Sequence, residues 1–198
     1  SRNLPGISYA ACCKQWCLAG STNGKAQSTK QVTCDKRTPF PLKIFIAGIS
    51  GLLGLNLALQ MADRHQLSGC YLNHPISLEG VSLARVDLTR SGDTIDAITA
   101  IRPDVVINTV ALTDVDRCQK DPKLALSINV DSAHNVALAC QAVGACLMHI
   151  STDQLFDGSE TWKTETKPLS PPNHYGETKM RAEEVVTEVC PGALVVRT

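Results

Sequence analysis

The sequence has no excess of charge of either sign. Its 198 residues contain 19 Lys and Arg against 19 Asp and Glu, so electrostatics gives no reason to expect nucleic acid as a partner. It has no apolar run that approaches the length of a membrane-spanning helix, so no membrane is expected. Internal repeats and low-complexity tracts are absent too. We therefore expect a globular, cytoplasmic protein.

The nine cysteines follow no paired C-x-x-C pattern. Those from Cys70 onward are scattered, as is typical of small buried residues in a reducing compartment. Cys12, Cys13, Cys17 and Cys34 share a segment that contains no histidine. No metal site is therefore expected, and no disulfide framework either.

Acidic residues are scarce at the start of the chain. Asp35 is the single acid in residues 1–41, and six basic residues accompany it. The segment is rich in Ser, Thr, Gly and Pro and has no helical or strand period. We expect residues 1–41 to be a poorly ordered, basic, cysteine-containing leader. An organelle transit peptide and a non-native or mis-called leader are both open interpretations.

A glycine turn follows at the start of residues 42–198. An apolar run at residues 43–47 leads into Gly48, Gly51 and Gly54, and an apolar helical stretch comes next. This order of strand, turn and helix is typical of a dinucleotide-binding βαβ unit. Gly48 allows a tight turn, Gly51 lets the backbone approach a pyrophosphate, and Gly54 lets the helix pack against the strand. The helix N–H groups then face the phosphates.

The rest of the chain alternates between strand and helix patterns. Strands are expected at 43–47, 69–73, 81–86, 104–108, 145–150 and 193–197. Helices are expected at 51–65, from Ser91 or Asp93 to Pro103, from Asp121 to Gly144, and at 174–189, with a loop at 157–173. This alternation predicts an α/β fold with a doubly wound parallel sheet, a Rossmann-type dinucleotide-binding domain at 42–198.

Three polar residues near the end of the chain complete a catalytic pattern. Thr152 follows the strand at 145–150, at the sheet edge where open α/β sheets bind ligands. Tyr175 and Lys179 lie one helical turn apart on one face. A lysine ammonium beside a phenol is expected to lower the tyrosine pKa, which suits Tyr175 to proton transfer. An ordinary exposed Tyr/Lys pair would be the simpler interpretation of either residue alone.

The cofactor's ribose is not specified. Dinucleotide folds often place an acid, or an arginine for a 2′-phosphate, after the second strand, but Asn73 and His74 stand there. The expected cofactor is therefore NADP or NAD, with NADPH slightly favoured.

The combined motifs resemble the extended short-chain dehydrogenase/reductases, and within them the dTDP-4-dehydrorhamnose reductase branch. The similar stretches are Gly48-x-x-Gly51-x-x-Gly54, residues 102–108, Asn129-Val130, residues 149–158 and residues 175–179. The resemblance implies an NAD(P)H-dependent reductase of a 4-keto nucleotide sugar. Its partner would be the nucleotide-sugar substrate, and a homodimer is compatible with it.

The resemblance also implies residue roles. Thr152, Tyr175 and Lys179 would be catalytic, with Tyr175 as the acid/base and Lys179 on the nicotinamide ribose. The other cofactor contacts would be Gly48, Ser50, Gly51, Leu52, Leu53 and Gly54 at the pyrophosphate, Asp87 and Leu88 at the adenine, and Thr109, Val110 and Ala111 along the cofactor. Asn129 would lie near the site, or would serve packing alone.

The sequence departs from the family at three points. Thr109 and Val110 are bulkier than the usual small residues, and Gln154 replaces an aromatic residue. The family also continues beyond Thr198 into its substrate part, so we expect a fragment whose last strand leaves apolar surface uncovered.

Two other functions stay open. One is a nucleotide-sugar epimerase or dehydratase, for which Asp153 could act as an acid. The other is a non-catalytic binding module that resembles the regulatory subunit of methionine adenosyltransferase.

Overall fold

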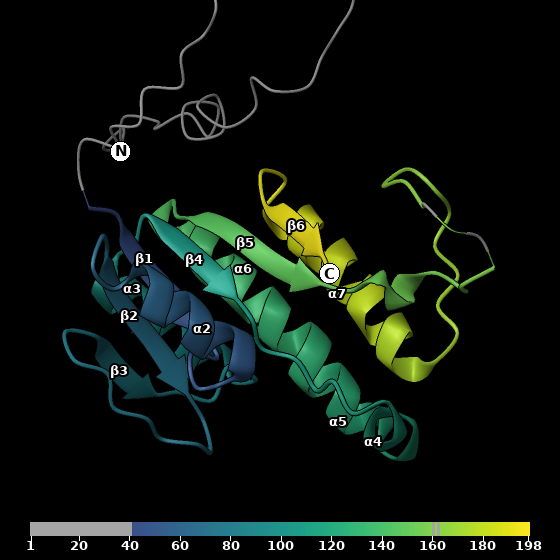
Figure 1. The fold of residues 1–198 in the computed structure, drawn as a ribbon, viewed down its shortest axis with the longest axis horizontal. Coiled ribbons are helices and arrows are strands. Elements are labelled where there is room, and N and C mark those ends of the chain that lie inside the picture. The colour runs from purple at the N-terminus through teal and green to yellow at the C-terminus, as the bar shows by residue number, and fades with distance from the viewer. Residues whose placement is uncertain (1–40, 160, 162) are drawn as a thin grey trace, which may run out of the picture. The chain divides into compact units, whose positions relative to one another are not determined.

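The computed structural model describes residues 41–159, 161 and 163–198. The leader predicted for residues 1–41 lies outside the described residues except for Pro41. The described chain forms one six-stranded sheet in the order β3-β2-β1-β4-β5-β6, and every neighbouring pair is parallel (Figure 1). The predicted doubly wound, Rossmann-type α/β fold is therefore confirmed.

The strands and helices alternate along the chain. The strands are β1 Lys43–Ala47, β2 Gln66–Tyr71, β3 Ser82–Arg85, β4 Val105–Asn108, β5 Cys146–Ser151 and β6 Leu194–Arg197. The α-helices are α2 Leu52–Met61, α3 Ser91–Ile101, α4 Val115–Lys120, α5 Pro122–Leu126, α6 Ser132–Val143 and α7 His174–Val189. A π-helical turn, η1 Ser127–Asp131, joins α5 to α6, and a 3-10 turn, η2 Asp153–Leu155, follows β5.

The strand order reverses between β1 and β4. Ile46 on β1 pairs with Gly69 on β2 at one side and with Ile107 on β4 at the other. The chain from β1 to β3 winds in one direction, and the chain from β4 to β6 winds in the opposite direction. In open α/β sheets this reversal leaves a crevice at the carboxyl ends of the strands.

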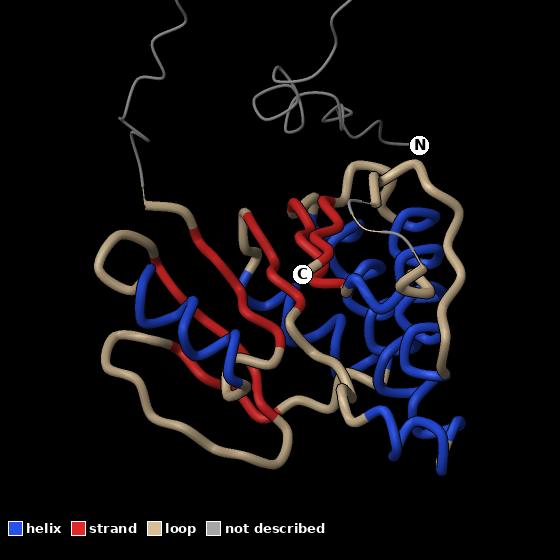
Figure 2. Tube along the Cα trace, turned by 45° about the vertical axis from the view of Figure 1, so that its right-hand side comes forward, coloured by secondary structure: helices blue, strands red, loops and turns tan. Residues whose placement is uncertain are grey.

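Helices α3, α6 and α7 pack on one face of the sheet and α2 packs on the other, which explains why the inner strands are continuously apolar,. Phe45, Val106 and Leu147 belong to a core shared with buried residues of α3, α6 and α7. Ile44 and Ile107 belong to a second core that includes Ala58 of α2. Figure 2 shows a single helix, α2, in front of the strands.

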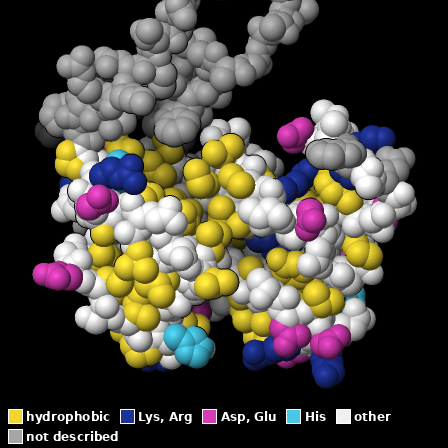
Figure 3. All heavy atoms as spheres, viewed as in Figure 1, with side chains coloured by type: hydrophobic (Ala, Val, Ile, Leu, Met, Phe, Trp, Pro, Cys, Tyr) yellow, Lys and Arg dark blue, Asp and Glu magenta, His cyan; other side chains and the backbone are white. Residues whose placement is uncertain are grey.

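Some apolar surface remains exposed. Leu194 on the edge strand β6 is 50% exposed, and Leu52 and Leu59 of α2 are 86% and 63% exposed. Figure 3 shows hydrophobic side chains on the face of the molecule where α2 lies. No helix in the part of the chain that the structure describes has the length and apolar character needed to cross a bilayer.

Several predicted boundaries are wrong. The first helix ends at Met61 instead of residue 65, and β2 begins at Gln66 instead of residue 69 because Gln66 pairs with Lys43. The N-cap of α3 is Arg90, which makes no side-chain cap hydrogen bond, instead of Ser91 or Asp93. The predicted start at Asp121 is confirmed, because its carboxylate accepts from the Leu124 N–H at 3.0 Å. Helix α4 was not predicted.

Candidate active site

The glycine turn brings the start of α2 against the end of β1. Gly48 has φ +79°, a left-handed conformation that side chains rarely adopt,. A Cβ on Gly54 would lie 2.5 Å from Gly48 O, so the helix can approach the turn only because residue 54 has no side chain. No side chain caps α2, and its first turn carries no acid. The N–H groups and the positive end of the helix dipole therefore face outward, as an anion site requires.

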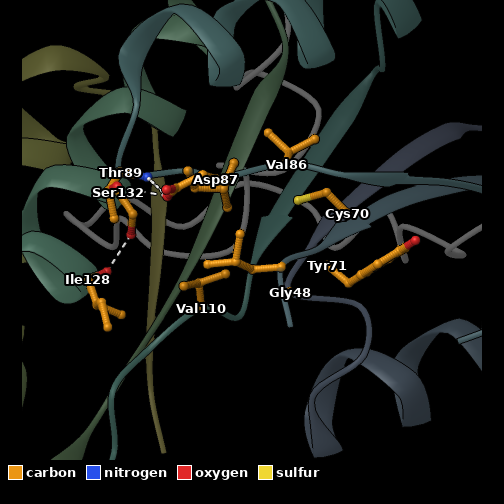
Figure 4. Close-up of a pocket in the computed structure, with 11 residues that line it drawn as sticks. Gly48, Cys70, Tyr71, Val86, Asp87, Thr89, Val110, Ile128 and Ser132 are labelled. Atoms are coloured by element: carbon orange, nitrogen blue, oxygen red, sulfur yellow. Dashed lines mark hydrogen bonds between the residues drawn. The ribbon is translucent and has the colours of Figure 1, made fainter. Parts of the chain in front are cut away.

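A pocket of about 100 Å³ opens beside this turn (Figure 4). Gly48 lies next to Val110 at one wall, and Thr89 and Ser132 also line the pocket. Asp87 Oδ1 accepts hydrogen bonds from the Thr89 hydroxyl at 2.7 Å and the Thr89 N–H at 3.0 Å, which closes the loop after β3. The lining is mostly apolar, as suits a flat aromatic ring.

The structure brings four of the residues predicted to bind the cofactor into this pocket: Gly48, Asp87, Leu88 and Val110. Ser50, Gly51, Leu52, Leu53 and Gly54 form the adjoining turn and the start of α2. Seven other lining residues were not predicted: Cys70, Tyr71, Leu72, Val86, Thr89, Ile128 and Ser132. The first three stand where β2 ends, at Tyr71. The predicted strand ends at residue 73 instead, which points to Asn73 and His74.

The two bulky residues after β4 are accommodated by the missing Cβ of Gly48. A Cβ there would lie 2.8 Å from Val110 Cγ2 and 3.1 Å from Thr109 Oγ1. The Thr109 hydroxyl donates to Ala47 O at 2.8 Å and so fastens β4 to β1. Thr109 therefore stabilises the turn itself, while Val110 lines the pocket and Ala111 continues the loop.

Thr152 and Tyr175 come together at the carboxyl end of β5. Thr152 is 6% exposed, and its hydroxyl accepts from the Gln154 N–H at 3.2 Å. Tyr175 stands in the first turn of α7, which the Asn173 side chain caps by accepting from the Gly176 N–H at 2.8 Å. The Thr152 hydroxyl lies close enough to the phenol of Tyr175 to act on its pKa. The two hydroxyls are therefore within reach of one substrate oxygen.

The expected direction of the Tyr175 pKa is wrong. Burial raises the pKa of Tyr175, and the hydrogen bond with Thr152 only partly opposes this effect. The phenol packs in a small core with Cys118 and Ala125, from helices α4 and α5. Lys179 is not among the groups that shift its pKa. The phenol therefore keeps its proton at neutral pH and is able to donate it.

Lys179 is turned into the protein interior. It is 1% exposed, and its Nζ donates to Ile150 O at 2.6 Å and lies 3.4 Å from His149 Nε2. Burial lowers the pKa of Lys179 to about 8, although the charge of Glu183 acts in the opposite direction. Ammonium and amine forms of Lys179 are therefore both accessible close to neutral pH.

Asn129 connects the loop after β4 with α7. Its Oδ1 accepts from the Leu112 N–H at 2.6 Å, and its Nδ2 donates to Leu112 O at 3.2 Å and to the Thr178 hydroxyl at 2.8 Å. The Thr178 hydroxyl in turn donates to Tyr175 O at 2.8 Å. Asn129 lies in the π-helical turn η1, a feature often found at functional sites,. Its contacts are polar, so packing alone does not account for it.

A second cavity, of about 480 Å³, adjoins Asp153. Its other lining residues come from the η2 turn, the following loop and β6: Gln154, Phe156, Gly158, Lys163, Thr164, Glu165 and Arg197. The Phe156 ring contacts Lys163 Nζ at 5.9 Å and Arg197 Cζ at 5.6 Å, both measured to its centroid. Among the described residues, no group of three or more His, Cys, Asp and Glu side chains is arranged to hold a metal.

The buried His149 makes the fold sensitive to acid. It is fully buried, and burial, helped by the charge of Lys179, lowers its pKa from 6.5 to about 3. Between pH 6.5 and 3 the unfolded chain binds a proton that the folded chain does not, so stability falls as the pH falls through this window. We expect the free energy of unfolding to drop by about 3 kcal/mol more between pH 7 and 4 in the wild type than in His149→Gln. Urea unfolding at each pH measures it.

The exposed His74 provides the control for this acid effect. His74→Gln should keep the wild-type pH dependence, because it removes an exposed histidine and leaves the buried His149 in place. Equal pH slopes for the wild type and His149→Gln would show that His149 is not buried in its neutral form.

Comparison with known proteins covers the same part of the chain. A family model described as the RmlD substrate binding domain matches residues 42–198. A dTDP-4-dehydrorhamnose reductase of Streptomyces griseus is 34% identical over 164 residues, which cover 81% of this chain and 51% of that protein.

Solved structures agree with this match. The crystal structure of dTDP-4-dehydrorhamnose reductase from Bacillus anthracis in complex with NADP has a TM-score of 0.70 and 29% identity, over 80% of this chain and 53% of that one. A hypothetical dTDP-4-dehydrorhamnose reductase from Sulfolobus tokodaii has a TM-score of 0.72 and 32% identity, over 79% of this chain and 55% of that one. The chain thus spans about half the length of these relatives.

Proposed function

The chain belongs to the RmlD substrate binding domain family, and from this membership we propose that it forms the cofactor-binding half of an NAD(P)H-dependent reductase of a 4-keto nucleotide sugar. The relatives that carry the name dTDP-4-dehydrorhamnose reductase support this substrate class. We place the enzyme in the cytoplasm and include a homodimer in the proposal.

One observation carries the proposal: the Thr152 hydroxyl acts on the Tyr175 phenol at the carboxyl end of β5, on the same sheet edge as the glycine turn. Ligands of open α/β sheets bind at this edge. A proton donor, a second hydroxyl and an anion-binding helix start therefore face one crevice, which is the set of groups that reduction of a carbonyl requires.

The residues at the glycine turn fit a dinucleotide. The space that a Cβ on Gly48 or Gly54 would fill, and the uncapped start of α2, suit a pyrophosphate held by Ser50, Gly51, Leu52 and Leu53,. Asp87 and Leu88 would lie at the adenine, and Thr109, Val110 and Ala111 would lie along the cofactor. Lys179 would donate to a ribose hydroxyl, because both its ammonium and its amine form keep an N–H besides the one that Ile150 O takes,. The bound cofactor would supply a hydride.

Tyr175 would protonate the substrate oxygen. Burial raises the pKa of its phenol and so keeps the proton available at neutral pH,. Thr152 would hold the same oxygen through its hydroxyl and fix its distance from Tyr175. Both side chains are almost completely buried, which excludes water from the transfer,.

The second cavity is where we place the anionic part of the substrate. It begins at Asp153, the residue after Thr152, and extends to Lys163 and Arg197. Arg197 is held by Glu183 through contacts of 2.9 and 2.6 Å, so its guanidinium is fixed in position. A diphosphate in this cavity would put the attached sugar toward Thr152 and Tyr175.

Titration of the chain with NADPH and NADH tests the cofactor part. We expect saturable binding of both, with NADPH tighter, because no carboxylate follows β2 to take a ribose hydroxyl and Arg85 donates to Leu72 O at 3.0 Å there,. Nicotinamide fluorescence measures it. Gly48→Ala should abolish binding, whereas Gly80→Ala, which also replaces a left-handed glycine but meets no neighbour, should not.

The second step adds dTDP-4-dehydrorhamnose and follows loss of the reduced nicotinamide. Oxidation that requires the sugar supports the reductase. Cofactor binding without oxidation by any keto sugar would contradict it and favour the non-catalytic module. Conversion of a sugar nucleotide with no net change in the cofactor would favour the epimerase or dehydratase alternative.

A further inference from the structure

Three buried polar side chains, Asn108, His149 and Lys179, form a row of contacts. The proposed reaction gives no role to the first two. His149 on β5 is paired in register with Asn108 on β4. His149, Asn108 and Lys179 are each at most 1% exposed. Asn108 Nδ2 lies 3.3 Å from His149 Nδ1, and His149 Nε2 lies 3.4 Å from Lys179 Nζ. The imidazole therefore bridges a strand amide and the lysine.

The direction of these contacts follows from one backbone group. The Val110 N–H, which can only donate, points to Asn108 Oδ1 at 3.1 Å. This contact identifies the amide oxygen, so the atom that faces His149 is the NH₂ group, which also can only donate. His149 Nδ1 must then carry the lone pair. In a neutral imidazole the proton lies on the other nitrogen, Nε2, and points to Lys179.

Lys179 is the last of these three side chains. Its Nζ donates to Ile150 O at 2.6 Å, which fixes the end of the side chain at the end of β5. Toward the Nε2–H of His149 it can only accept, and an amine has the lone pair for this whereas an ammonium has none. The charge of Glu183 raises the pKa of Lys179, and the Glu183 carboxylate is itself held by Arg197.

We propose that His149 is a positioning residue for Lys179: Asn108 holds its imidazole as the Nε2–H tautomer, which directs the lysine onto Ile150 O and favours its amine form. The tautomer stands on the described contacts alone, and only its relevance to the reaction rests on the proposed function. Burial, which lowers the pKa values of both His149 and Lys179, acts in the same direction.

The tautomer can be measured on the full chain without cofactor or substrate. Long-range ¹H–¹⁵N correlation spectra of chain labelled with ¹⁵N-histidine show which ring nitrogen carries the proton. The signals that disappear in the His149→Gln variant are those of the His149 ring. At pH 9, above the pKa of Lys179, we expect a neutral His149 with its proton on Nε2. A proton on Nδ1, in a neutral ring or an imidazolium, would overturn the proposal.

A second variant tests whether Asn108 sets the tautomer. Asn108→Asp keeps an oxygen for the Val110 N–H but presents a second oxygen to His149, so we expect a proton on Nδ1. Asn135→Asp, at another buried asparagine whose Nδ2 donates to Leu88 O at 3.0 Å, is the matched control and should leave His149 unchanged. An Nδ1 that stays unprotonated in folded Asn108→Asp would overturn the assignment. If this variant does not fold, the wild-type spectrum still decides the tautomer.

A failed proposed function would look different. A chain that binds no nicotinamide cofactor, or that oxidises none with a keto sugar, would contradict the reductase and leave the His149 spectrum as expected here. A proton on Nδ1 in a chain that does reduce the sugar would contradict only the positioning role.

Discussion

Tyr175→Phe is expected to lower the sugar-dependent oxidation of NADPH by about 10²- to 10⁴-fold, which is the usual contribution of general acid catalysis. The phenol beside Thr152 is the proton donor of the proposed reaction, and its raised pKa keeps it protonated. Phenylalanine keeps the ring in its core with Cys118 and Ala125 but removes the proton. Initial rates at saturating cofactor measure the effect.

Cofactor affinity is the internal control for Tyr175→Phe. The dissociation constant of NADPH should stay within about twofold, and the free energy of unfolding should fall by about 1 kcal/mol, the contribution of one lost hydrogen bond. Full activity in a folded variant would exclude Tyr175 as the acid. A parallel loss of cofactor binding would instead indicate a structural role for the phenol.

Gly54→Ala should destabilise the chain by about 1–3 kcal/mol and abolish cofactor binding. The added Cβ would lie 2.5 Å from Gly48 O and 2.8 Å from Ile49 Cα, and both are backbone atoms that can yield only if the turn itself moves,. Helix α2 would then move away from β1, and its N–H groups would no longer face one anion. Urea unfolding and NADPH titration measure the two losses.

Gly92→Ala is the matched control. Gly92 also lies in the first turn of a helix, α3, but a Cβ there meets no atom within 4 Å. This substitution should therefore stabilise the chain by about 0.4–1 kcal/mol, because alanine restricts the unfolded chain. Both variants replace glycine by alanine, so changes of opposite sign in the free energy of unfolding would show that the close approach at Gly54 causes the loss. Equal changes would show that the packing of α2 does not depend on this approach.

The features predicted correctly depend on local pattern. The apolar run at 43–47, the glycine turn and the alternation of strand and helix identify the sheet, because buried parallel strands and helices leave different periods in the sequence. The boundary between α2 and β2 was misplaced because Gln66 and Leu67 are in the sheet only through pairing with Lys43 and Ile44, which no local period records. Helix α4 was missed because its six residues are too few to show a period.

The candidate site was predictable in its members but not in its electrostatics. Chain order was enough to place Thr152 and Tyr175 at one strand end. The direction of the Tyr175 pKa was not predictable, because it depends on burial against Ala125 of α5 and Cys118 of α4, a helix that was not predicted. His149 was not singled out, since its importance comes from a contact with Asn108 on a neighbouring strand, 41 residues away in the chain.

The Asn129 side chain makes the loop after β4 and the start of α7 a single cooperative unit. One carboxamide satisfies both backbone groups of Leu112 and also holds Thr178, which holds Tyr175. A local fluctuation that frees Leu112 must leave these buried groups unpaired, and it loosens the anchoring of the acid at the same time. We therefore expect the loop after β4, which would lie along the cofactor, and Tyr175, which would protonate the substrate, to open together. The two would then be ordered during the same periods.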